Sequence, residues 1–367
     1  MVKEKMIYNN LILNENLFNL FKNYTNKNLP HSFIFYGNEG VGKFGHAIEF
    51  SNLILSKNAD KNITEDKIKK NLHENINFIL PLPKSRTISK NDPALKAVSK
   101  SDIDDIFNKI KLKLENPYFN INIDKANTIL INSIRDIKKK INLSNFNNQY
   151  NIYIIMNADK LCYPRSESAN SLLKILEEPN ENNLFILITS NISQMLETLT
   201  SRCVKIFFPK LKSNDINNFL NDNYNINNEN ISFISHCSKG NNSFAIDFLN
   251  EFEELKKDYI TLITLLNNFE IREWQKFSIL LKDKNKFKIL LKLLLVLLVD
   301  AANNKEVLPV YNFIGREVQK IFSLEIERIN IAVDLINKTN DNLKKNIHLP
   351  LLLTTFYLEI YNVLNEH

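Results

Sequence analysis

One short segment has the residue types and spacing of a phosphate-binding loop. Residues 37–44 read GNEGVGKF and match the pattern G-x-x-x-x-G-K, in which backbone N–H groups surround a phosphate and the lysine reaches its outer oxygens. Four of the six glycines fall within nine positions, namely Gly37, Gly40, Gly42 and Gly45. We therefore predict a nucleotide-binding loop whose phosphate contacts are the first three of these glycines and Lys43. The alternative is a glycine turn between a strand and a helix that binds no ligand.

The same loop lacks the groups that would hold a metal ion. In ATP-hydrolysing loops the position after the lysine is Ser or Thr, whose hydroxyl binds Mg²⁺, but here it is Phe44. The apolar run 152–155 should end in an acidic pair that binds the metal and polarises water, yet Met156 and Asn157 follow it. Asp159 lies at the wrong offset for a strand-end ligand, and we expect it to be a loop or helix cap. The loop is predicted to be degenerate, with no metal and with residual binding of ATP or ADP left open.

Arginine is scarce in this chain, so the positions that keep one are informative. Seven arginines stand against forty lysines in a sequence rich in Lys, Asn and Ile, as an AT-rich genome would produce. Arg202 lies directly before Cys203 and the apolar run 204–208. A planar, permanently charged guanidinium can stabilise negative charge on a transferring phosphoryl group. We predict a functional role for Arg202; the alternative is a solvated side chain at a strand edge.

Short apolar runs bounded by polar or turn-forming residues predict five buried strands. They cover residues 33–36, 76–80, 152–156, 184–188 and 204–208. Apolar residues at helical spacing predict helices over 130–141 and 169–176, the second of which is stopped by Pro179. Strands that alternate with helices indicate an α/β fold with a largely parallel sheet, of the kind that binds nucleotides.

The pattern changes after residue 208. We expect a parallel-sheet P-loop domain over residues 1–208, with an irregular, proline-containing insertion at about 57–125. No strand is expected beyond this domain. Residues 209–252 predict a small helical lid domain, and residues 253–367 predict a C-terminal all-helical collar domain that serves for oligomerisation.

Composition narrows the class of protein further. The chain is 44% hydrophobic and 24% charged, as a folded globular protein is, and its formal net charge of +6 is compatible with contact with nucleic acid. Three cysteines, Cys162, Cys203 and Cys237, form no closely spaced pair, which predicts a reducing, cytoplasmic location. The most apolar run, residues 289–299, is about half the ~20 residues of a membrane span, so we expect no membrane contact.

Residues 152–208 resemble the bacterial clamp-loader branch of the AAA+ family, and within it the delta-prime subunits of DNA polymerase III. The resemblance is specific because several motifs follow in the family's order and spacing. These are IMNADKL at 155–161, ANSLLKILEEP at 169–179, FILITSN at 185–191 and TSRC at 200–203. It implies an AAA+ domain followed by a helical lid and a helical collar.

The resemblance also implies a role for Arg202. Clamp loaders are rings of five similar subunits with ATP between neighbours, and the SRC arginine of one subunit enters the adjacent site. In this sequence that arginine is Arg202, which would act in trans as an arginine finger. Delta-prime subunits usually have a degenerate site of their own, as Phe44, Met156 and Asn157 indicate here. The implied partners are the gamma/tau motor subunits and the delta subunit, with the sliding clamp and primer-template DNA reached through the complex.

The chain also departs from the family's pattern. Many members carry a four-cysteine zinc module after the first helix, but no cysteine precedes Cys162, so no zinc is predicted. Thr189 occupies the first-sensor position. In the second-sensor region, residues 239–245, Phe244 lies roughly where active subunits have a basic residue. These departures predict a subunit that requires no cofactor.

The favoured hypothesis is a non-catalytic, delta-prime-type subunit of the DNA polymerase III clamp-loader complex, which supports ATP-dependent loading of the sliding clamp on primed DNA. One alternative is an autonomous AAA+ ATPase acting on DNA, such as a gamma/tau-like motor subunit, with a metal held through water or Asp159. Another is an unrelated ATP-binding regulator that shares only the glycine loop. The first hypothesis is favoured because three positions lack the residue that catalysis requires, whereas Arg202 is present.

Overall fold

The computed structural model describes residues 6–57, 59–143, 149–268, 270–281, 283–304, 306–343, 345 and 348–365. The chain forms two compact units. The first unit comprises Met1–Phe219 together with Gly240–Ser243, and the second comprises Leu220–Lys239 together with Phe244–His367. None of the helices in the described ranges is both long and apolar enough to cross a membrane.

The first unit is built on a parallel sheet whose strand order is β2-β3-β4-β1-β5. The strands are β1 (Ser32–Gly37), β2 (Ile76–Ile79), β3 (Asn151–Met156), β4 (Asn183–Thr189) and β5 (Val204–Phe208). All four ladders are parallel, so the predicted strands and the predicted α/β fold class are confirmed. The two outer strands are less buried than the prediction assumed, because each pairs on one side only, and Phe207 of β5 keeps 55% of its surface exposed.

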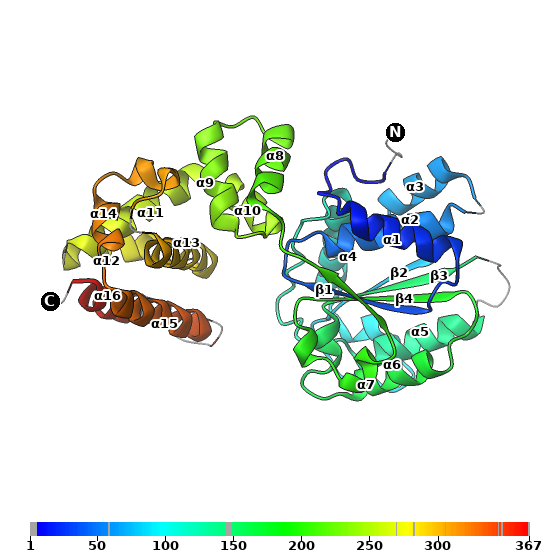
Figure 1. The fold of residues 1–367 in the computed structure, drawn as a ribbon. Coiled ribbons are helices and arrows are strands. Elements are labelled where there is room, and N and C mark those ends of the chain that lie inside the picture. The colour runs from blue at the N-terminus through cyan, green and yellow to red at the C-terminus, as the bar shows by residue number, and fades with distance from the viewer. Residues whose placement is uncertain are drawn as a thin grey trace. The chain divides into compact units, whose positions relative to one another are not determined.

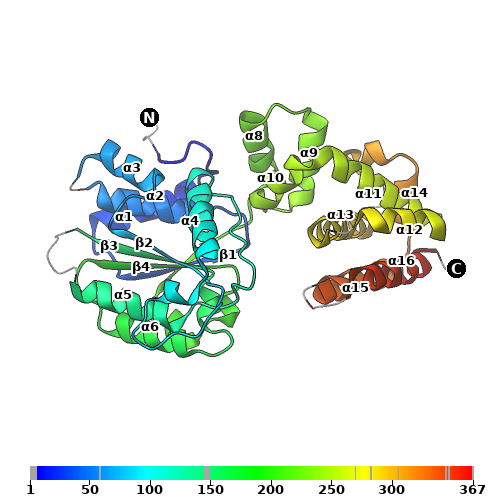
Figure 2. The same ribbon diagram turned by 180° about the vertical axis from the view of Figure 1, so that it is seen from behind.

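Helices cover both faces of this sheet, as Figures 1 and 2 show. One layer contains α1 (Glu15–Asn26), α2 (Lys43–Leu55), α3 (Lys61–Lys69) and α4 (Lys100–Glu115). The other contains α5 (Ile131–Leu143), α6 (Glu167–Glu177) and α7 (Glu197–Thr200). Three short 3-10 turns complete the unit: η1 (Ala94–Ala97), η2 (Ala158–Leu161) and η3 (Ile192–Gln194).

The interior strand β1 is apolar from Phe33 to Tyr36 because both of its faces are covered. Phe33 and Phe35 point to one face, where they meet the rings of Phe21 and Phe50, with centroids 5.3 Å apart for the Phe33–Phe50 pair. Ile34 points to the other face and joins the core formed with α5 and α6. Alternate residues therefore link β1 to both helical layers.

The segment expected as an irregular insertion contains two helices, α3 and α4. Helix α4 begins at a cap in which Ser99 Oγ accepts a hydrogen bond from the Asp102 N–H, and its Ile106 and Ile110 are buried at i, i+4 spacing. The prolines, which lie before α4, suggested an irregular segment, although the capping serine and the apolar spacing both marked a helix. These helices complete one of the two layers over the sheet.

The chain after β5 is helical in every described element. The helices are α8 (Ser213–Asn223), α9 (Asn228–Ser238), α10 (Asn242–Asn250), α11 (Phe252–Asn267), α12 (Ile271–Leu280), α13 (Lys284–Asn303), η4 (Pro309–Ile314), α14 (Glu317–Phe322), α15 (Ile326–Leu343) and α16 (Leu349–Asn365). The division of this part into a lid domain over 209–252 and a collar domain over 253–367 stays a prediction.

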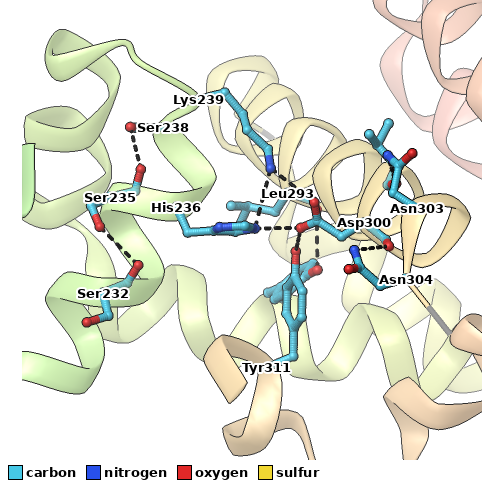
Figure 3. A network of polar contacts seen from close by, with 12 residues as sticks. Ser232, Ser235, His236, Ser238, Lys239, Leu293, Asp300, Asn303, Asn304 and Tyr311 are labelled. Atoms are coloured by element: carbon cyan, nitrogen blue, oxygen red, sulfur yellow. Dashed lines mark hydrogen bonds and ion pairs between the residues drawn. The ribbon is translucent and has the colours of Figure 1, made fainter. Parts of the chain in front are cut away.

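A partly buried polar network joins α9, α13 and η4 within the second unit (Figure 3). At its centre is Asp300 of α13, whose carboxylate accepts hydrogen bonds from Tyr311 Oη at 2.6 Å and Lys239 Nζ at 3.1 Å and lies 2.5 Å from His236 Nε2. Burial alone would raise the pKa of Asp300, but these hydrogen-bond donors outweigh it and hold the pKa below its ordinary value. The charged carboxylate therefore ties three elements together.

We expect Asp300→Ala to lower the free energy of unfolding of this unit by about 2–4 kcal/mol, because Tyr311 Oη is left buried without its acceptor. The single tryptophan, Trp274, is buried against Tyr357 in the same unit, so its fluorescence during urea denaturation measures the change. Asp334→Ala, at an exposed position on α15, is the control and should stay within about 0.5 kcal/mol. The difference should shrink as the pH falls from the ordinary carboxyl pKa of about 4 through the lower pKa that Asp300 has in the folded protein. A loss equal to that of the control would contradict this account of the network.

Candidate functional site

The glycine loop connects the end of β1 to the start of α2, as the sequence predicted. Gly37 has φ +140°, and a Cβ at this position would lie 2.2 Å from the carbonyl oxygen of Phe208. Gly40 has φ +68°, and a Cβ there would lie 1.9 Å from Asn241 Oδ1. Both positions therefore exclude a side chain, the first because β5 lies close and the second because residues 240–243 pack on the loop.

Lys43 is held by the loop itself. Its Nζ donates hydrogen bonds to the carbonyl oxygens of Gly37 at 2.6 Å and Asn38 at 2.5 Å, and lies 3.4 Å from Ser190 Oγ. Burial lowers its pKa to about 8, even though the carboxylates of Glu39 and Asp159 act in the opposite direction. The structure thus brings Gly37, Gly40, Gly42 and Lys43 into one loop, but a phosphate would have to draw the ammonium away from these oxygens.

An apolar side chain occupies the loop position where a metal ligand would lie. Phe44 is 5% exposed, and its ring centroid lies 5.9 Å from that of Phe78 on β2. With Met156 and Asn157 it lines a cavity of about 420 Å³ next to Lys43. No group of three or more His, Cys, Asp or Glu side chains is placed to hold a metal ion in the part of the chain that the structure describes.

Asp159 has a partner other than a metal. Its Oδ1 accepts a 2.7 Å hydrogen bond from Thr189 Oγ1, the residue at the first-sensor position at the end of β4. Asp159 lies in η2 and not at the end of a strand. The pair links η2, the turn that follows β3, to the end of β4, so Asp159 has a structural role of the kind expected for it.

Arg202 lies on the surface, in the turn between α7 and β5. Its Nη2 is 2.8 Å from Glu177 Oε1 at the end of α6, and its Nη1 donates to the carbonyl oxygen of Thr198 at 2.9 Å. The side chain keeps 39% of its surface exposed. The sequence motif LLKILEEP contains Glu177 but does not predict its pairing with Arg202, because the contact joins residues from different elements.

Arg202 and the glycine loop lie at opposite ends of the sheet. Ser32, the first residue of β1, donates a hydrogen bond from Oγ to the carbonyl oxygen of Arg202 at 3.0 Å. From there β1 pairs in parallel with β5, from Phe33 opposite Val204 to Gly37 opposite Phe208. At a rise of about 3.3 Å per residue these four steps separate the two ends by about 13 Å, so Arg202 is held at a distance from its own loop.

The sequence also singled out Phe244 and the three cysteines. Phe244, at the second-sensor position, belongs to the second unit, where the Nζ of Lys292 lies 3.2 Å from its ring centroid. Burial raises the pKa of the thiols of Cys162, Cys203 and Cys237, which makes these cysteines poor nucleophiles.

A parallel sheet of this strand order, with a glycine loop after the interior strand β1, defines the first unit as a P-loop domain of the AAA+ type. Residues 13–212 match the family model described as DNA polymerase III, delta subunit. This match covers more than half of the chain, and the chain belongs to that family, in agreement with the resemblance to clamp-loader subunits of the delta-prime type.

Individual relatives match over shorter stretches. The chain is 32% identical over 161 residues to DNA polymerase III subunit delta' of Buchnera aphidicola subsp. Baizongia pistaciae (strain Bp), covering 40% of this chain and 47% of that protein. It is 31% identical over 147 residues to DNA polymerase III subunit gamma of Buchnera aphidicola subsp. Schizaphis graminum (strain Sg), covering 39% and 40%. It is 34% identical over 79 residues to subunit delta' of Bacillus subtilis (strain 168), covering 22% and 23%. The chain thus spans less than half the length of each of these relatives.

We expect the purified protein to show no Mg²⁺-dependent hydrolysis of ATP, because Phe44 and Met156 cannot bind the metal. Release of phosphate from MgATP measures this, with Lys43→Ala as the control for a contaminating ATPase. Turnover that disappears in Lys43→Ala would contradict the prediction and favour an autonomous ATPase.

The buried ammonium of Lys43 should make stability depend on pH. Its pKa of about 8 in the folded protein lies below the ordinary 10.5, so the folded state disfavours the charged form below pH 8, and this penalty fades as the pH rises towards 10.5. The unfolding free energy of Lys43→Met minus that of the wild type should therefore fall by about 2 kcal/mol between pH 7 and pH 9.5. Urea denaturation followed by circular dichroism measures the difference, with the exposed Lys205→Met as control. A difference that stays constant, or that follows the control, would contradict the burial of a charged Lys43.

Proposed function

We propose that this chain is a delta-prime-type subunit of a DNA polymerase III clamp loader that hydrolyses no ATP itself and supplies Arg202 to the ATP site of a neighbouring motor subunit. One observation carries this proposal. Arg202 is exposed at the amino end of β5, while the glycine loop lies at the carboxyl end of the adjacent strand β1. An arginine in this position serves only a nucleotide that another chain holds.

The contacts of Arg202 are compatible with a role in trans. Its partners are an exposed carboxylate and a backbone carbonyl oxygen, and exposed ion pairs of this kind contribute only about 0–1 kcal/mol. A triphosphate of a neighbouring subunit would offer the guanidinium a much higher density of negative charge. Moving Arg202 from Glu177 to such a phosphate therefore costs little.

The contacts of the chain's own glycine loop support the proposal that the chain hydrolyses no ATP itself. Lys43 is bound to loop carbonyl oxygens, Phe44 is packed in the core, and Asp159 is paired with Thr189. Each group that would act in hydrolysis is either replaced or engaged elsewhere. We infer that the loop has a structural role and that any nucleotide bound there is not turned over, so that no cofactor is required.

The proposed partners follow from the family. They are the gamma/tau motor subunits and the delta subunit, with the sliding clamp and primer-template DNA contacted through the assembled loader, in a cytoplasmic hetero-oligomer. The helical second unit would supply subunit contacts, since Ile326, Ile331 and Leu351 each expose more than half of their surface. Contact with DNA would be non-specific, because the lysines are dispersed along the chain.

The decisive variant is Arg202→Ala. The finger acts on a transition state in another polypeptide, so we expect normal assembly but a loss of roughly 10³-fold or more in hydrolysis at the recipient site. Arg202→Lys should be nearly as damaging, because a compact ammonium lacks the planar fork of guanidinium. The measurement is ATPase and clamp loading by the loader reconstituted with its motor and delta subunits, stimulated by clamp and primed DNA.

Arg165→Ala is the matched control, since Arg165 is also an exposed arginine of the first unit, with its side chain 84% exposed. It should assemble and load clamps like the wild type, and gel filtration checks complex formation in all variants. If Arg202→Ala assembles and its stimulated rate equals that of Arg165→Ala, Arg202 is an ordinary surface residue and the proposal is wrong.

A further inference from the structure

Strand β2 has an open side. It is the outermost strand of the sheet, and within the described residues it pairs with β3 alone, beginning with Ile76 opposite Ile152. The Ile152 N–H donates to the carbonyl oxygen of Asn75, and because ladder bonds alternate along a strand, Asn77 and Ile79 direct their backbone groups to β3. Phe78 therefore directs its N–H and C=O outward, and neither group has a hydrogen-bond partner within the described part of the chain.

A groove of about 610 Å³ runs along this open side. Residues 76–80 form its floor, residues of α4 form one wall, and residues of α5 form the other. Successive strand residues point to opposite faces of a sheet, so a groove that touches five in a row must follow the edge of the strand. Figure 2 shows α4 and α5 on opposite faces of the sheet, with β2 between them.

The lining of the groove is mainly apolar and open to solvent. Phe107 of α4 exposes 49% of its surface and Leu95 of η1 exposes 39%, which is unusual for large apolar residues that face a common hollow. The other apolar side chains along the walls are Leu82, Ile106, Ile110 and Ile137. Such a lining accommodates apolar side chains at alternate positions of an extended peptide.

The rim of the groove carries positive charge beside the strand. Lys140 Nζ donates to Asn77 Oδ1 of β2 at 2.8 Å, and Lys139 is exposed on the preceding position of α5. The acidic group of the lining, Asp136, accepts a 2.8 Å hydrogen bond from the Ala94 N–H and lies 3.8 Å from Lys139 Nζ. The net charge of these three side chains is positive, which favours acidic residues in a segment that binds along the edge of β2.

We propose that this groove binds an extended segment of a partner protein in which apolar residues alternate with acidic ones, and that the segment pairs with β2 as a sixth strand of the sheet. Unpaired backbone groups, an apolar hollow along the edge and lysines at its rim are the features that strand addition uses. A second copy of this chain fits less well, because it would bring its own Lys139 and Lys140 to the same edge. The inference does not rest on the role of Arg202.

The probe is a set of fluorescein-labelled octapeptides in which valine, isoleucine or phenylalanine alternates with glutamate, added to the full-length protein. We expect saturable fluorescence anisotropy, at least tenfold weaker binding when lysine replaces glutamate, and slower amide hydrogen exchange at Phe78 on binding. N-methylation of the peptide at positions that pair with β2 should abolish binding, whereas N-methylation at the intervening positions should not. If none of the peptides binds, or if both N-methylated series bind equally, strand addition is excluded.

Two variants on α4 locate the site. Phe107→Asp places a charge in the groove and should weaken binding at least tenfold. Leu112→Asp, at a residue of the same helix that is 44% exposed but does not line the groove, should change binding less than twofold. Equal effects of the two variants would contradict the proposal. Dimerisation that Phe107→Asp abolishes, seen in sedimentation of the protein without peptide, would also overturn it, because a second copy would then occupy the edge.

Discussion

Strand β1 pairs in parallel with β4 on one side and β5 on the other, and this pairing fixes where the candidate functional groups lie. Its carboxyl end leads into the glycine loop, and its amino end holds the turn of Arg202 through the hydroxyl of Ser32. Because the strands run in the same direction, the loop and the arginine are kept at opposite edges of one rigid sheet. In the proposed function, Arg202 would therefore reach a nucleotide held by a neighbouring chain and not one in its own loop.

Within the loop, contacts among the protein's own groups take the place of contacts with a nucleotide or a metal ion. The ammonium of Lys43 is bound by the carbonyl oxygens of Gly37 and Asn38, and Phe44 extends the core where a metal ligand would be. Burying a phenylalanine contributes about 1.5–3 kcal/mol, whereas a buried hydroxyl in an empty site would need a partner of its own. Phe44 in this position therefore stabilises the loop without requiring a ligand.

Much of this structure was predictable from local patterns, and the remainder depended on contacts between distant residues. The five strands were evident as short apolar runs because both faces of the sheet are covered, and the loop was evident because Gly37 and Gly40 have conformations that suit glycine. Helix α4 was missed because prolines precede it in the chain. The Arg202–Glu177 pair and the packing of residues 240–243 on Gly40 join segments 25 or more positions apart, and no local spacing encodes such contacts.

The two outer strands of the sheet are protected in different ways. β5 carries the exposed charge of Lys205 in its middle, a common means of preventing association at a sheet edge. β2 reads INFI and has no charged residue of its own, so its protection comes from Lys140 of the neighbouring helix, which is bound to the side chain of Asn77. A lysine in that place repels a second copy of the same edge but attracts an acidic segment. Under the proposed strand addition, this edge would therefore disfavour a second copy and favour a partner of opposite charge, a selectivity that a charged residue within the strand would provide only by filling the groove.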